Sequence, residues 1–295
     1  MHLVAGASAA IFPLTYEQFD LIGFEETIAA DYDDTLLDIA RRYSIGQEEI
    51  LLANPEVDRW LPGEGKPVVI PSRYVLPDAP REGLVLNLPE MRLYHYPEPA
   101  EGETREVQTY PVSIGRMDWA TPLGVTKVTR KQKDPPWYPP ESIRREHAEQ
   151  GDPLPRVVPP GPDNPLGRHA IRLGIPAYLI HGTNKAYGVG MRVSHGCVRM
   201  LPEDIEALFP QVDRGTKVHI INQPVKAGWY GGKLYLEVHP PLEEHPLNAR
   251  EMDDLVSEVL DKALSLRAAD IDEDAVTAAV TRMSGMPEVI SKDFL

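Results

Sequence analysis

The chain has 295 residues, 42% of them hydrophobic, and a formal net charge of −15. This length and apolar content suffice for a sizeable core and predict more than one module. The acidic excess argues against nucleic acid or an anionic membrane as a partner, and no stretch approaches the roughly 18–20 apolar residues of a membrane span.

The N-terminal segment, residues 1–25, opens with a stretch of twelve residues that is mostly apolar and rich in small residues. Ala7-Ser8-Ala9 has the composition of a signal-peptidase cleavage site, which would make this stretch the end of a signal peptide that begins upstream. Because a basic region is lacking, an ordinary N-terminal segment is the equal alternative.

Residues 26–72 have the pattern of a small βααβ unit. Asp34 is expected to cap a first helix, and Gly46 to end it in a left-handed conformation. A second helix is expected over residues 47–53, followed by a closing strand over residues 68–71. The apolar positions of the first helix are Leu36, Ile39, Ala40 and Tyr43.

This unit resembles LysM, a module that binds glycan. The resemblance lies in the order of the elements and in these residues: Asp34-Thr35-Leu36, Ile39-Ala40, Tyr43, Asn54-Pro55 and Val69-Ile70-Pro71. The alternative is a structural domain that no longer binds sugar. The resemblance therefore implies, but does not require, a peptidoglycan-binding function.

A proline-rich linker, residues 73–81, separates this unit from a region of short strands. Strands divided by Gly and Pro predict a β-sandwich or a β-barrel over residues 82–222. The expected strands are 83–88, 91–96, 107–114, 125–130, 170–173, 178–181 and 216–221.

The region is interrupted at residues 134–164, which hold many prolines and show no clear periodicity. A loop of this length inside a compact domain usually has a function or moves. We expect a lid over the site, with a passive surface excursion as the alternative.

The C-terminal region, residues 223–295, is predicted to form a strand and a helical subdomain. The strand is expected at residues 234–239, and apolar residues at helical spacing follow over residues 248–284. Asp272 is expected to cap the second helix, and Gly285 to follow its end. The helices are expected to pack onto the rest of the chain, so that the whole is multidomain and mainly β.

Cys197 is the single cysteine of the chain. It excludes an intrachain disulfide framework and a multi-cysteine metal site. A lone cysteine is more often a small core residue than a nucleophile, so the decision depends on its neighbours.

Those neighbours have the chemistry of acyl transfer. His181 is expected at the end of a strand and Cys197 in a glycine turn. An imidazole can take the proton of a thiol whose ordinary pKa is about 8.5. Backbone amides in the turn could bind an oxyanion, and Arg199 could bind a carboxylate. Zinc held by His181, His195 and Cys197 is the metal alternative.

Residues 181–200 resemble the signature of the L,D-transpeptidase family, also called YkuD-like. The matching positions are His181, Ser194, His195, Gly196, Cys197 and Arg199. The resemblance extends over residues 82–222. In the order of its modules, and in segments such as 159–165, the chain resembles the periplasmic enzymes that attach Braun's lipoprotein to peptidoglycan.

The resemblance implies a two-step exchange at Cys197. The thiol, activated by His181, attacks the meso-diaminopimelate carbonyl of a tetrapeptide stem, D-Ala leaves, and an amine then takes the acyl group from the thioester. No metal or other cofactor is implied. The Gly182 carbonyl would orient His181, the amides of Gly196 and Cys197 would bind the oxyanion, and Arg199 would bind a substrate carboxylate or, alternatively, form a salt bridge that holds the turn.

Ser194, His195 and Asn184 complete the set of residues expected around the substrate or the oxyanion. The favoured acceptor is the C-terminal lysine of a Braun-type lipoprotein, and the alternative is another diaminopimelate, which gives 3–3 cross-links. A cysteine amidase and a non-catalytic wall-binding protein are the remaining alternatives. All of these functions place the protein in the periplasm.

Overall fold

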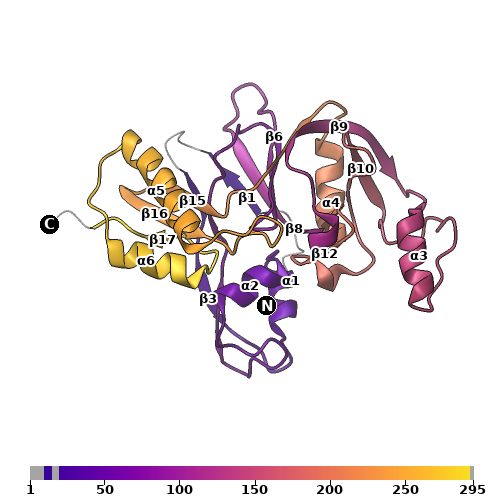
Figure 1. The fold of residues 1–295 in the computed structure, drawn as a ribbon, viewed down its shortest axis with the longest axis horizontal. Helices are drawn as coiled ribbons and strands as arrows, with labels where there is room; N and C mark the ends of the chain where they lie inside the picture. The colour runs from indigo at the N-terminus through magenta and orange to yellow at the C-terminus, as the bar shows by residue number, and fades with distance from the viewer. Residues whose placement is uncertain (1–9, 15–19, 293–295) are drawn as a thin grey trace.

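The computed structural model describes residues 10–14 and 20–292. They form a β-barrel, a small βααβ unit and a C-terminal α/β unit, arranged side by side (Figure 1). The proposed cleavage site at residues 7–9 lies outside the described residues. Among those that are described, no helix has the length and apolar character needed to cross a membrane.

The barrel confirms the mainly β prediction and decides between the two expected architectures. The strand order is β1-β8-β13-β11-β10-β9-β14-β6-β7, and an additional β7–β8 pairing closes the path into a ring. The strands of this sheet are β1 (Ala10–Pro13), β6 (Gly83–Asn87), β7 (Arg92–Tyr96), β8 (Glu106–Gly115), β9 (Gly124–Lys133), β10 (His169–Leu173), β11 (Leu179–His181), β12 (Arg192–Ser194), β13 (Val198–Met200) and β14 (Lys217–Ile221).

All seven expected strands of this region are present, because alternating apolar residues fill the barrel interior. Leu84, Leu86, Leu93 and Ile171 are fully buried in this core. Each such side chain contributes about 1.5–3 kcal/mol. The helix α4 (Pro202–Leu208) adds Ile205 and Leu208 to the same cluster.

The βααβ unit has the expected element order. It consists of β3 (Glu26–Ala29), α1 (Leu36–Arg42), α2 (Gln47–Ala53) and β4 (Pro67–Ile70). The two strands pair antiparallel, and the helices bury their apolar faces against them.

The expected helix ends of this unit were wrong in two places. Thr35, not Asp34, is the N-cap of α1, and it forms a reciprocal capping box with Asp38. Ser44 has the left-handed conformation after α1, with a φ of 55°. Gly46 instead has a φ of −70° and is the N-cap of α2.

The expected linker at residues 73–81 begins as a strand. β5 (Arg73–Val75) pairs antiparallel with β2 (Leu21–Gly23), and Tyr74 and Val75 are buried. The burial of Tyr74 and Val75 explains why this part of the expected linker is a strand. The sequence did not indicate it, because three residues are too few to show the alternation of a strand. The linker therefore ties the N-terminal segment to the body of the protein.

The interruption at residues 134–164 also contains regular structure that the sequence pattern did not predict. Its helix α3 (Glu141–Glu149) buries only Ile143, so it has almost no apolar stripe. The Asn164 side-chain amide donates to the carbonyls of Pro135, at 2.8 Å, and Pro159, at 3.1 Å. These bonds fold the two ends of the segment together.

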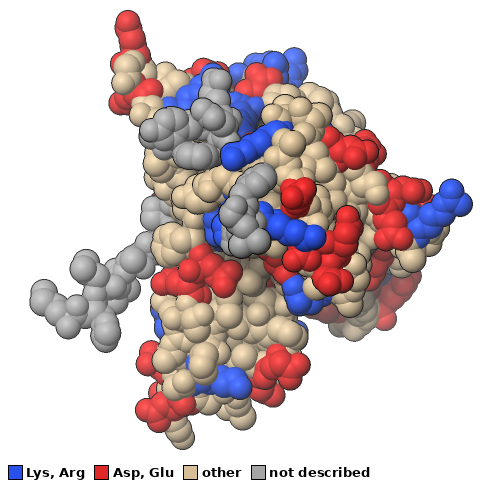
Figure 2. All heavy atoms as spheres, turned by 90° about the vertical axis from the view of Figure 1, so that its left-hand side faces the viewer, with Lys and Arg blue, Asp and Glu red and all other residues tan. Residues whose placement is uncertain are grey.

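The C-terminal unit has its own core. Its strands β15 (Val225–Tyr230), β16 (Lys233–Val238) and β17 (Glu288–Val289) form one sheet. The helices α5 (Ala249–Leu266) and α6 (Glu273–Arg282) pack on this sheet rather than on the barrel, and Asp272 caps α6 as expected. Figure 2 views this end of the molecule and shows acidic side chains in several groups across the face.

The βααβ unit docks onto the loop that precedes β12 through backbone contacts. The amides of Gln47 and Glu48, at the start of α2, donate to the carbonyls of Val189 and Gly190 at 3.1 and 3.0 Å. A β-carbon on Gly190 would lie 2.2 Å from the Gln47 nitrogen, and Gly190 has a φ of +88°. The close approach therefore requires glycine at this position.

Gly190→Ala is expected to undock the βααβ unit from the barrel. The left-handed backbone alone costs an alanine about 1–2 kcal/mol, and the clash with Gln47 adds to this. We expect a lower melting temperature and faster proteolysis near residues 42–47. Gly188→Ala is the matched control, because a β-carbon on Gly188 would have nothing within 4 Å of it; equal melting of both variants would contradict the docking.

Candidate active site

Two parallel strands bring the expected nucleophile and base into one place. β11 ends at His181, and β13 begins one residue after Cys197. Their register pairs Ile180 with Val198 and His181 with Arg199. His181 is thus at a strand terminus, as the sequence indicated, and the glycine turn that carries Cys197 lies alongside β11.

The Cys197 thiol is half-buried and is held by the end of the turn before β11. Its sulfur lies 3.6 Å from the carbonyl oxygen of Ala177, to which it donates. Burial raises the pKa of the thiol, while the Leu179 amide and the charges of Arg199 and Arg172 act in the opposite direction. The resting group is therefore a thiol, with a donor and two cations placed to stabilise a thiolate.

His181 is buried with its tautomer fixed. Nδ1 donates to the Gly182 carbonyl oxygen at 2.6 Å, so Nε2 carries the lone pair. Burial, and then the charge of Arg199, lower the pKa of His181 to about 4. The imidazole is neutral at pH 7 and able to accept a proton. Within the described residues it is not hydrogen-bonded to the thiol.

The turn that carries the nucleophile is stabilised by hydroxyl groups. The Gly196 amide donates to Ser194 Oγ at 3.1 Å, and Ser194 Oγ donates to the Cys197 carbonyl. Thr121 Oγ1 donates to the Gly196 carbonyl at 2.9 Å. Gly196 has a φ of +98°, and a β-carbon there would lie 2.9 Å from the Tyr178 ring. Because the Gly196 amide is occupied, the Cys197 amide is the better placed of the two expected oxyanion donors.

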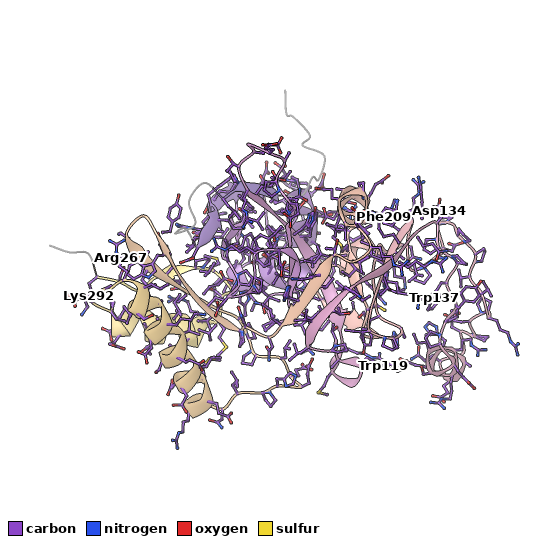
Figure 3. The ribbon with its side chains drawn as sticks, turned by 90° about the horizontal axis from the view of Figure 1, so that it is seen from above. Trp119, Asp134, Trp137, Phe209, Arg267 and Lys292 are labelled. Atoms are coloured by element: carbon purple, nitrogen blue, oxygen red, sulfur yellow. The ribbon has the colours of Figure 1, made fainter. Side chains whose placement is uncertain are left out.

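His195 faces away from this turn toward the 134–164 segment. Its Nε2 is 2.9 Å from Glu146 Oε2 in α3, and Arg116 Nη2 donates to the other Glu146 oxygen at 2.8 Å. The Trp119 ring meets His195 edge-on, with centroids 5.4 Å apart. Figure 3 shows Trp119 and Trp137 at the same end of the molecule as α3, opposite Arg267 and Lys292. The inserted segment therefore reaches the nucleophile turn.

Two arginines, Arg199 and Arg172, act electrostatically on the Cys197 thiol. Neither Arg199 nor Arg172 forms an ion pair with a described residue. Arg199 is half-buried and its burial lowers its pKa, whereas Arg172 is exposed on β10. An unpaired guanidinium at this position suits a carboxylate of a substrate.

Asn184 and Gly182 connect the end of β11 to its surroundings. Asn184 is exposed, and its amide donates to the Asp163 carbonyl at 3.2 Å. The Gly182 amide donates to the His169 carbonyl at 3.1 Å. Asn184 thus contacts the inserted segment rather than the nucleophile.

Side chains of the types that bind metals lie close together at a different place from Cys197. Among the described residues, Glu90, Glu237 and His239 bring ligand atoms within 4.8 Å of one another, whereas His181, His195 and Cys197 form no such group. The ammonium of Lys226 already lies between the two carboxylates, 2.7 Å from Glu237 and hydrogen-bonded to Glu90. A lysine is therefore the cation of this cluster.

The sequence pattern missed several groups around the sulfur. Leu179 and Ala177 act through their backbones, and turn geometry alone places them. Arg172 lies in an expected strand, where its alternation with Ile171 and Leu173 indicated an outward side chain but not its distance from Cys197. Glu146 lies in the helix that the pattern did not reveal.

Known proteins are similar in sequence to this chain, both in the region of the site and over nearly its whole length. Residues 81–220 match the family model described as the L,D-transpeptidase catalytic domain (YkuD). A probable L,D-transpeptidase ErfK/SrfK of Salmonella typhimurium is 43% identical, over 98% of this chain and 94% of its own. The probable L,D-transpeptidases YcfS and YbiS of Escherichia coli are 42% and 40% identical, over 97% and 95% of this chain and 89% and 92% of theirs.

Proposed function

Because this chain belongs to the L,D-transpeptidase family, we propose that it exchanges an amide of a peptidoglycan stem through a thioester on Cys197. The observation that carries the proposal is the pairing of β11 with β13. In that pairing, the strand that ends at the neutral, tautomer-fixed His181 runs beside the strand that follows the turn of the lone cysteine, which supports the proposal.

In the first step, His181 Nε2 takes the thiol proton and Cys197 Sγ attacks the meso-diaminopimelate carbonyl of a tetrapeptide stem. The Cys197 amide stabilises the oxyanion, and His181 returns the proton to the D-Ala nitrogen as the C–N bond breaks. A thioester remains on Cys197. Arg199 and Arg172 bind stem carboxylates.

In the second step, an amine attacks the thioester and the thiol is regenerated. The energy of the cleaved amide is kept in the thioester, so the exchange needs no ATP. We favour the C-terminal lysine of a Braun-type lipoprotein as acceptor, because the sequence resemblance to the enzymes that attach this lipoprotein spans all modules of the chain rather than the catalytic motif alone. Peptidoglycan stems lie outside the cytoplasmic membrane, which places the proposed reaction in the periplasm.

Product analysis tests the reaction and its acceptor. The full chain is incubated with disaccharide-tetrapeptide, with and without a lysine-terminated peptide, and the products are identified by mass spectrometry. A stem–peptide amide with release of D-Ala supports lipoprotein anchoring. A 3–3 dimer as the sole product would replace that acceptor by diaminopimelate, and a free tripeptide as the sole product would replace transfer by amidase activity.

The 134–164 segment is proposed to be a lid that keeps water from the thioester. Its Glu146 binds both Arg116 and His195, so α3 is held against the nucleophile turn. The Asn184–Asp163 bond holds a second point of the segment to the end of β11. Exclusion of water favours an amine over hydrolysis as the fate of an acyl-enzyme.

Glu146→Gln is expected to increase the hydrolysed fraction of the acyl-enzyme by about two- to fivefold, because a neutral amide holds His195 and Arg116 less firmly. The measurement is the ratio of tripeptide to transfer product at fixed amine concentration. Glu149→Gln is the control, since it lies exposed in the same helix. An unchanged ratio in Glu146→Gln would leave α3 as a passive excursion.

The βααβ unit is proposed to bind glycan, as its likeness to LysM suggests. The loop after β3 and the loop after α2 are joined by a 2.9 Å bond from the Leu36 amide to the Arg59 carbonyl. They expose Tyr32 and Trp60, which are 79% and 57% accessible. Exposed aromatic faces on adjacent loops suit the apolar faces of sugar rings.

Trp60→Ala is expected to weaken co-sedimentation with purified peptidoglycan by about three- to tenfold, through loss of its ring contacts. Phe24→Ala is the control, because Phe24 is equally exposed but precedes β3, away from the two loops. An equal loss of co-sedimentation in both variants would indicate non-specific hydrophobic adsorption rather than a sugar-binding site.

A further inference from the structure

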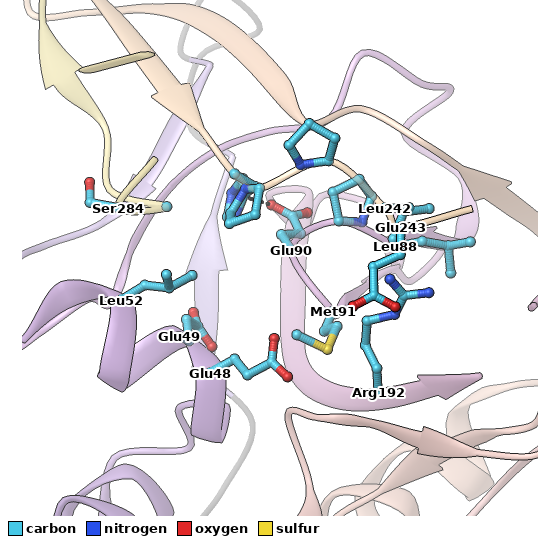
Figure 4. Close-up of a pocket in the computed structure, with 15 residues that line it drawn as sticks. Glu48, Glu49, Leu52, Leu88, Glu90, Met91, Arg192, Leu242, Glu243 and Ser284 are labelled. Carbon is cyan, nitrogen blue, oxygen red and sulfur yellow. Dashed lines mark ion pairs between the residues drawn. The ribbon is translucent and has the colours of Figure 1, made fainter. Parts of the chain in front are cut away.

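A cavity of about 210 Å³ lies where the three parts of the protein meet (Figure 4). α2, the turn between β6 and β7, and the segment after β16 form its walls. Leu52, Leu88, Met91 and Leu242 line it with apolar surface, and Glu48, Glu90 and Glu243 line it with carboxylates. None of the proposed catalytic residues lines this cavity.

Negative charge exceeds unpaired positive charge around the cavity. Arg192, the arginine that lines the cavity, is paired with Glu244, although its charge also acts on Glu48. Two further cations outside the lining are paired as well, Arg92 with Glu49 at 2.7 Å and Lys226 with Glu237 at 2.7 Å and with Glu90. Glu48 and Glu243 have no ion pair with a described residue. The cavity is therefore acidic.

Glu90 adds a second, independent feature. Its side chain is 2% exposed, and Oε2 accepts from Lys226, while Oε1 has no hydrogen-bond partner among the described residues. Burial raises the pKa of Glu90, while the charge of Lys226 acts in the opposite direction. A donor bound in the cavity would satisfy this oxygen.

The spacing of the carboxylates argues against a single metal ion in the cavity. Within the part of the chain that the structure describes, Glu48, Glu90 and Glu243 do not bring their oxygens within the 4.8 Å that one metal ion would need. The ammonium of Lys226 occupies the Glu90–Glu237 cluster, where ligand atoms do converge. An ammonium on an aliphatic stem suits the apolar wall and needs only Glu90 as a direct acceptor, because Glu48 and Glu243 can act through their charge alone.

We propose that this cavity binds a primary ammonium group on an aliphatic stem, such as a lysine side chain. Glu90 Oε1 accepts from the ammonium, Glu48 and Glu243 supply further negative charge, and the leucines and Met91 contact the stem. The site is separate from Cys197 and stands whether or not the proposed transfer reaction is correct.

Calorimetric titration of the full chain tests the site. The probes are pentylamine, as a free amine, and Nα-acetyl-lysine N-methylamide, as a lysine within a chain. The Nε-acetylated form of the second probe is the neutral control, and calcium chloride is the metal control. Binding of the lysine probe, with loss on acetylation, is expected; binding of pentylamine alone would restrict the site to free amines and overturn the lysine assignment.

Glu243→Gln and Glu48→Gln are each expected to weaken binding of the lysine probe by about tenfold. Glu90→Gln is expected to weaken binding further. The melting temperature of this variant is also measured, because the substitution removes the negative charge that pairs with Lys226 and can therefore destabilise the fold. Glu258→Gln, exposed on α5, is the control for general charge. Equal binding of the acetylated probe, competition by calcium, or full binding by both Glu48→Gln and Glu243→Gln would overturn the proposal.

Discussion

Cys197→Ala is expected to abolish acyl-enzyme formation. The chain has one cysteine, and the thioester requires its sulfur, so no other described side chain of the site can replace it. The measurement is intact mass after incubation with the disaccharide-tetrapeptide, or with a carbapenem as a reactive acyl donor. The native protein is expected to gain one acyl group, and the variant none.

The sulfur is half-buried and contributes little to the core, so the variant is expected to keep the native melting temperature. That comparison separates loss of chemistry from loss of fold. An adduct of the same mass on Cys197→Ala would overturn the nucleophile assignment and, with it, the proposed mechanism.

His181→Ala is expected to lower the acylation rate by about 10²- to 10⁴-fold, the usual effect of removing a general base. His195→Ala is the matched comparison within the same motif. It removes the Glu146 contact but not the base, and a reduction of about tenfold or less is expected. A larger loss in His195→Ala than in His181→Ala would reverse the two roles.

The pH profile gives the sharper evidence on His181. Its pKa of about 4 means that the ring is neutral, and competent as a base, above that pH and loses activity as the pH falls through it. The native acylation rate is therefore expected to vary little between about pH 5.5 and 8. Without the base, the reaction needs preformed thiolate, so the rate of His181→Ala should rise with pH toward the burial-raised pKa of Cys197.

Much of the fold followed from periodicity, because the barrel strands alternate strongly and their apolar residues fill one core. Short elements were not predicted. β12 and β13 have three residues each, which is too few for an alternating pattern to be visible in the sequence. α3 escaped because it is a polar surface helix with one buried residue. Asp34 and Thr35 are both good N-caps, and only the Asp38 contact selects Thr35.

The sequence also indicated part of the candidate site. A motif places His181 and Cys197 in sequence, and the pairing of β11 with β13 brings their strands together. Gly46 illustrates the limit: it was expected to end a helix, but it lies against Gly190 across the docking of the βααβ unit. Contacts between distant segments, such as Glu146 with His195, have no local pattern from which they could be predicted.

The half-buried thiol has a further consequence, for the lifetime of the protein in an oxidising environment. Peroxides attack the thiolate, and sensor cysteines are exposed and acidic. Cys197 is neither, since burial raises its pKa and keeps the sulfur protonated between turnovers. In the proposed reaction, His181 takes this proton in the step in which the sulfur attacks the substrate. The same burial that makes the resting sulfur a weak nucleophile thus protects it from oxidation to the sulfenic acid, a protection that a chain with no second cysteine cannot obtain from a disulfide.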